Sequence, residues 1–230
     1  MRHYALLPLV LIALSGAACA PRPADPLPQP AGPAVSVETL PAVESAPAFS
    51  TYSNSEFGLR FNYPPGWFGP DEYISGQTLR VAVGSDVVYP YSTSREEQVF
   101  TVPDAYYVVV QFTRADDNPF TDETLLSLES LADGDSISDQ RGLLTRVRPL
   151  ELGGYQGFEF ITTLSESAQT EPFFARQVIL RDGRSSTLTI MASPNNVQIS
   201  AGEDWRAAYR RVDEAHLPDF RLIVDSVRLE

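Results

Sequence analysis

The feature that most constrains this chain is a change of composition near residue 48. Residues 21–47 contain eight prolines in 27 positions, with much alanine and no aromatic side chain. Such a segment cannot bury enough apolar surface to offset the entropy lost on ordering. Beyond it, apolar and polar residues alternate, and β-branched and aromatic side chains become frequent. We therefore expect one folded domain, residues 48–230.

Residues 1–18 have the pattern of a secretory signal peptide. Arg2 and His3 precede the apolar stretch Ala5 to Leu14, and the small residues Ser15 to Ala18 follow it. This order of charge, apolar run and small residues is typical of export. About ten apolar residues are too few for a permanent membrane span. The sequence therefore predicts an exported protein.

The end of this signal, Leu14-Ser15-Gly16-Ala17-Ala18-Cys19, resembles a bacterial lipoprotein signal. The resemblance implies that Cys19 is acylated, with palmitate among its chains, and becomes the first mature residue; Gly16 departs from the leucine usual there. Residues 19–47 are then the lipidated cysteine and a disordered tether, which holds the domain at the extracytoplasmic face of the cell membrane. Two alternatives stay open: a secreted protein, because Ala18-Cys19-Ala20 also fits a small-x-small cleavage pattern, and a proline-rich ligand in place of the tether.

Several kinds of active site are excluded by residues that the chain lacks. All 17 basic residues are arginine, which excludes a Schiff-base lysine and the lysine of a P-loop. Only His216 lies beyond the signal, so a three-histidine zinc site is excluded. Cys19 is the single cysteine, so the domain has neither a disulfide nor a cysteine nucleophile. The net charge of −13 argues against a nucleic-acid partner.

Alternating patterns predict strands at seven places, with a short closing strand at 226–229. They are residues 58–63, 79–84, 105–113, 143–150, 155–164, 173–180 and 186–192. Gly153-Gly154 and Asp182-Gly183 predict tight hairpins, whose strands must be antiparallel.

Helices are expected in two regions, with a further helical turn near the end. Asn118-Pro119 opens a helix over 121–131. The second helix spans 203–216 and places Trp205, Ala208, Tyr209 and Val212 on one face. A helical turn over 218–225 leads to the closing strand. The sequence therefore predicts an α+β fold, an antiparallel β-sheet flanked by helices.

Three segments, 57–67, 150–160 and 220–229, resemble parts of PsbP-like domains of the Mog1/PsbP fold, in the same order. The first, Phe57-Gly58-Leu59-Arg60-Phe61-Asn62-Tyr63-Pro64-Pro65-Gly66-Trp67, looks like the opening strand and turn of that family. The resemblance implies an α/β/α sandwich of the Mog1/PsbP type. It implies no catalytic residues or cofactor, because members of the family serve as accessory, stabilising or binding subunits.

Candidate metal ligands occur in two acidic loops. One contains Asp116-Asp117-Asn118 with Asp122 and Glu123, and the other contains Asp133, Asp135 and Asp139. Clustered carboxylates suit calcium, but the second loop lacks the spacing and terminal glutamate of an EF-hand. We expect both loops to be solvated, without a metal ion.

The remaining candidates are aromatic residues and His216. Tyr89-Pro90-Tyr91 and Tyr106-Tyr107 could present an aromatic surface to a sugar or protein, although half-buried strand packing is the expectation; Trp67 is expected in the core. His216 should end a helix, where a cation complements the helix dipole.

These features together predict a non-catalytic, membrane-anchored binding or accessory lipoprotein, with an envelope protein as candidate partner. The alternative is an extracytoplasmic hydrolase that uses carboxylates or His216, which requires those groups to converge in a pocket.

Overall fold

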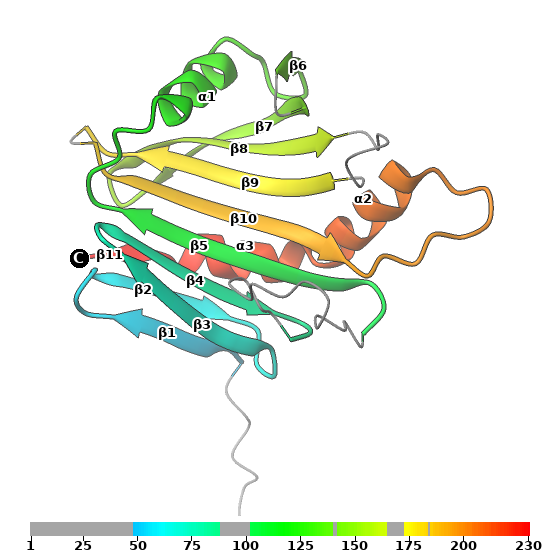
Figure 1. Cartoon of the computed structure of the whole chain (residues 1–230), viewed down its shortest axis with the longest axis horizontal. Helices are drawn as coiled ribbons and strands as arrows, with labels where there is room; N and C mark the ends of the chain where they lie inside the picture. The colour runs from blue at the N-terminus through cyan, green and yellow to red at the C-terminus, as the bar shows by residue number, and fades with distance from the viewer. Residues whose placement is uncertain (1–47, 88–101, 140–141, 165–172, 184) are drawn as a thin grey trace, which may run out of the picture. The chain divides into compact units, whose positions relative to one another are not determined.

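The computed structural model describes residues 48–87, 102–139, 142–164, 173–183 and 185–230 (Figure 1). The predicted signal peptide, the Cys19 attachment site, the tether and Tyr89-Pro90-Tyr91 all lie outside the described residues.

Most described strands belong to one eight-stranded antiparallel sheet, the large sheet, in the order β3-β4-β5-β10-β9-β8-β7-β6. Its strands are β3 (Phe68–Ser75), β4 (Thr78–Gly84), β5 (Ala105–Thr113), β6 (Ser136–Asp139), β7 (Gly142–Leu152), β8 (Tyr155–Leu164), β9 (Phe173–Arg181) and β10 (Thr187–Asn195). The hairpins predicted at Gly153-Gly154 and Asp182-Gly183 are confirmed, since β7 pairs with β8 and β9 pairs with β10.

A smaller sheet contains β1 (Ser50–Asn54), β2 (Leu59–Tyr63) and β11 (Arg228–Leu229), with β2 in the centre. Gly58, in the turn before β2, has φ +66°, and a Cβ placed on it would lie 2.4 Å from the carbonyl oxygen of Glu230. The close approach of the last strand therefore requires glycine there.

Three helices are described: α1 (Pro119–Glu129), α2 (Trp205–Ala215) and α3 (Leu217–Ser226). Side chains cap the first two, because Asn118 accepts a hydrogen bond from the amide of Phe120 and Asp204 accepts one from that of Arg206. The predicted helical turn over 218–225 is in fact the ten-residue helix α3.

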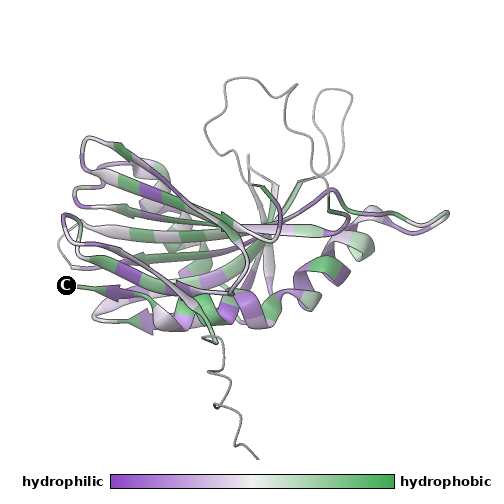
Figure 2. Cartoon of the chain, turned by 90° about the horizontal axis from the view of Figure 1, so that it is seen from below, coloured by the Kyte–Doolittle hydropathy of each residue, from purple (hydrophilic) through white to green (hydrophobic). Residues whose placement is uncertain are grey.

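The two faces of the large sheet differ in what covers them. One face packs against α2, α3 and the small sheet (Figures 1 and 2). Together they bury the main core, which includes Phe61, Tyr106, Leu188 and Phe220. Trp67 was expected in the core, but it is only partly buried and packs against the core from outside. Burial of side chains of this size contributes about 1.5–3 kcal/mol each.

The other face of the large sheet, the open face, contacts α1 near the β6 end of the sheet. There Leu128 of α1 packs with Leu144, Phe160 and Ile179 in a second, smaller cluster. The fold is thus α+β with antiparallel sheets, as predicted.

Candidate functional site

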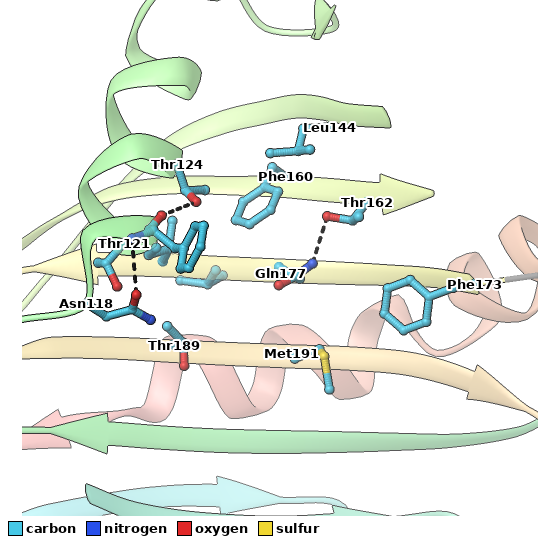
Figure 3. Close-up of a pocket in the computed structure, with 13 residues that line it drawn as sticks. Asn118, Thr121, Thr124, Leu144, Phe160, Thr162, Phe173, Gln177, Thr189 and Met191 are labelled. Carbon is cyan, nitrogen blue, oxygen red and sulfur yellow. Dashed lines mark hydrogen bonds between the residues drawn. The ribbon is translucent and has the colours of Figure 1, made fainter. Parts of the chain in front are cut away.

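A groove of about 330 Å³ lies on the open face, between α1 and strands β8, β9 and β10 (Figure 3). Phe120, Phe160, Phe173 and Met191 supply most of its large apolar side chains, and Thr162 and Gln177 are among its polar ones. The 13 lining residues include no aspartate, glutamate, histidine, lysine or arginine. The described part of the lining therefore carries no charge, although a fifth of all residues in the chain are charged.

Strand register brings the floor of the groove together. Gln177 of β9 is directly opposite Phe160 of β8 and Met191 of β10. Directly opposite residues in antiparallel strands point to the same face, so these three side chains form one row. Next to this row, the Gln177 amide nitrogen donates a hydrogen bond of 2.7 Å to the hydroxyl of Thr162 (Figure 3).

The α1 wall is held in place by the first acidic loop. Asp116 accepts hydrogen bonds from the hydroxyl of Thr121 at 2.8 Å and from the amide of Asn118 at 3.0 Å. Burial raises the pKa of Asp116, but these hydrogen bonds outweigh it and leave the pKa below its ordinary value. Arg181 of β9 binds the carboxylate of Asp122 and donates to the carbonyl oxygen of Asp116 at 3.0 Å. This loop therefore uses its charges to position α1.

The second acidic loop is a turn between α1 and β6. The Asp133 carboxylate lies 2.9 Å from Nε of Arg146, and that of Asp135 accepts a hydrogen bond from the amide of Ala132 at 3.2 Å. Asp139 ends β6, and its side chain lies outside the described part. Within the described ranges, no three histidine, cysteine, aspartate or glutamate side chains are grouped to hold a metal ion.

A buried ion cluster lies on the opposite face of the large sheet, under α2 and α3. Glu159 of β8 is fully buried and binds Arg176 and Arg221 through Oε1 at 2.8 and 2.9 Å, and Arg148 through Oε2 at 2.9 Å. Burial raises the pKa of Glu159, but hydrogen bonds from the three guanidinium groups outweigh it, so the pKa lies below its ordinary value. The carboxylate is therefore ionised and bound by protein donors.

Asp213 of α2 completes the cluster. Its Oδ2 lies 2.6 Å from Nη2 of Arg176, and its Oδ1 accepts a hydrogen bond of 2.8 Å from the Tyr106 hydroxyl. Burial, followed by the Asp213 charge, raises the pKa of Tyr106, so the phenol stays protonated and donates. The cluster thus fastens α2 and α3 to strands β5, β8 and β9.

His216 joins α2 to α3, which confirms its expected place at a helix end. Its ring stacks on Tyr106 with centroids 4.9 Å apart, and its Nδ1 lies 2.9 Å from Oδ2 of Asp219. Among the described residues, no hydrogen bond joins His216 to a serine or threonine hydroxyl. The described residues therefore do not assemble the serine–histidine arrangement of a hydrolase.

The tyrosine pair Tyr106-Tyr107 confirms the expectation of strand packing. Tyr106 is buried in the main core, and Tyr107 is partly buried on the open face. A second, polar hollow of about 560 Å³ surrounds the turn between β1 and β2. Arg114 in this hollow already has partners within the domain: its guanidinium lies 4.5 Å from the Phe57 ring centroid and donates a hydrogen bond to the carbonyl oxygen of Glu56.

Acid is expected to destabilise the fold through Glu159. Because its folded-state pKa lies below the ordinary 4.5, its contribution to the free energy of unfolding is fully present above that value and is lost as the pH falls through the folded pKa. Urea unfolding between neutral pH and about pH 3 should show this loss, and Glu159→Gln should flatten it. Glu214→Gln changes an exposed residue and should keep the wild-type dependence of the free energy of unfolding on pH. The same pH dependence in all three proteins would contradict the role of Glu159.

The sequence did not predict that the floor residues of the groove form a site. Gln177 and Thr162 could have indicated it, because they are polar residues in strands whose neighbouring positions are mostly apolar.

No helix within the described ranges combines the length and the apolar character that a membrane crossing requires. No protein-family model matches the chain, and no curated protein has a significantly similar sequence. The chemistry of the groove is therefore what points to a function.

Proposed function

We propose that this protein is a membrane-anchored extracytoplasmic lipoprotein, attached through Cys19, whose domain is a non-catalytic binding or accessory module. The groove on the open face is the observation that carries the binding function. It offers apolar contact surface and a hydrogen-bonding pair, which are the usual contents of a binding site.

Catalysis by this groove is disfavoured by its lining. A general acid or base must lie within hydrogen-bond reach of the reacting group, and an activated nucleophile needs a base beside it. Within the described ranges, the lining contains no aspartate, glutamate, histidine, cysteine, lysine or arginine. A molecule in the groove is therefore held without meeting a titratable side chain among these residues.

We assign the domain to the PsbP-like type, with an α/β/α sandwich of the Mog1/PsbP fold. The three segments that resemble that family support the assignment. Segment 57–67 contains β2, and segment 220–229 contains β11 and most of α3. Helices on both faces of one antiparallel sheet also agree with it.

Crosslinking capture from native envelopes tests the binding function. The full chain, Met191→Arg and Leu126→Arg should be compared after crosslinking, both for captured proteins and for extractable small molecules. Met191 lines the groove, whereas Leu126 is 66% exposed on α1 and does not line it, so each variant adds the same charge to a different place. We expect at least one envelope component to be retained by the wild type and Leu126→Arg, and lost from Met191→Arg. Retention of the same components by all three proteins would contradict binding at the groove.

A further inference from the structure

The lining of the groove restricts the charge of its occupant. A charged group that leaves water needs a counter-charge or several hydrogen bonds, since its burial is otherwise costly. The lining residues that the structure describes offer no ionisable side chain, and the nearby Arg181 is already engaged by Asp122 and by the carbonyl oxygen of Asp116. An uncharged occupant avoids that cost.

The volume restricts the size of the occupant. About 330 Å³ lies at the lower end of the roughly 300–1,000 Å³ typical of small-molecule sites. The groove therefore suits a small molecule.

The side chains indicate the chemical class. Phe120, Phe160 and Phe173 come from three different elements, and Phe120 is still 56% exposed, so a flat ring that covers it buries further aromatic surface. Met191 adds a polarisable thioether, which makes favourable contacts with ring edges. In the centre, the Thr162 hydroxyl accepts one hydrogen bond from Gln177. Its proton can be donated to a ligand, and its second lone pair can accept a hydrogen bond from one.

We propose that the groove binds an uncharged aromatic small molecule that carries a hydrogen-bonding group, which aligns with the Gln177–Thr162 pair. This inference rests on the proposed binding function and specifies its ligand class. The rings of such a molecule contact the phenylalanine side chains and Met191. Its polar group lies beside Gln177 and Thr162, which point toward each other in the floor of the groove (Figure 3).

A matched pair of fluorescent probes tests the inference on the full chain. N-phenyl-1-naphthylamine is neutral, and 8-anilinonaphthalene-1-sulfonate has the same rings with one added sulfonate. We expect saturable binding of the neutral probe and binding of the sulfonate weaker by about tenfold or more, which corresponds to about 1.4 kcal/mol. Leu126→Arg should leave both affinities unchanged.

Met191→Arg should weaken the neutral probe and strengthen the sulfonate, because the new guanidinium supplies the missing counter-charge. An unfolded variant would not reverse the preference in this way. Equal affinities of the wild type for the two probes, no saturable binding of the neutral probe, or indifference of both affinities to Met191→Arg would each overturn the inference. If envelope capture still depended on Met191, the binding function would stand and only this ligand class would fail.

Discussion

Replacing Asp213 with alanine is expected to lower the free energy of unfolding by about 3–5 kcal/mol, the cost of breaking a buried ion pair from one side. The substitution would leave the Arg176 guanidinium buried with one carboxylate fewer and would remove the acceptor of the Tyr106 hydroxyl. Urea unfolding measures the change. Glu214→Ala is the matched control, because Glu214 is the next residue of α2 and is exposed, so its loss should change stability by no more than about 0.5 kcal/mol.

The double variant Arg176→Ala/Asp213→Ala sharpens this test. Removing both partners leaves no unpaired guanidinium, and Glu159 keeps Arg148 and Arg221. We therefore expect the double variant to lose less stability than the sum of the two single variants, which is the behaviour of directly coupled residues. Losses that simply add, or a loss in Asp213→Ala as small as that in Glu214→Ala, would contradict the cluster as the fastening of α2.

Cys19→Ser is expected to move the protein from the membrane fraction to the soluble fraction. Each buried methylene of an acyl chain contributes about 0.8 kcal/mol, and two or more chains anchor firmly where one is marginal. A net charge of −13 gives no electrostatic attraction to an anionic membrane surface. Fractionation, detergent partitioning and mass spectrometry of the N-terminus measure the outcome in a bacterium that processes lipoproteins.

The control for this experiment is Ala20→Ser, which makes a similar change beside the attachment site and keeps the cysteine. It should remain in the membrane fraction. If the parent chain already partitions into the aqueous phase with an unmodified N-terminus, Cys19 is not lipidated and the protein is secreted.

Local sequence patterns predicted most of the described strands. Successive side chains of a strand point toward the core and away from it in turn, which gives apolar and polar residues a period of two. The bounds of β5 and β8 agree fully with the prediction. β3 was missed because all eight of its residues are exposed, so that no apolar alternation marks it. β1 and β6 were missed as well, and their five and four residues are too few for a clear period.

The buried ion cluster could also have been anticipated, because two of its charged residues occupy core positions in the sequence pattern. Asp213 follows Tyr209 by four positions, so it belongs to the apolar face of α2. Arg176 lies two positions from the buried Val178, so it belongs to the face of β9 that points into the core. A charged residue at a core position indicates a buried partner, but the sequence does not say which one. The groove was harder to predict, because it depends on the register of three strands and on the docking of α1, which are contacts between residues far apart in the chain.

We propose that the open face of the large sheet is the binding surface of this protein. Heteronuclear NMR of the protein titrated with N-phenyl-1-naphthylamine tests it most directly, because each shifted signal has a place in the structure. We predict shifts grouped at Thr162, Gln177 and Met191 and at the beginning of α1, with the signals of Tyr106 and Asp213 on the opposite face unchanged. Shifts grouped on that opposite face, or around the polar hollow at Arg114, would contradict the claim.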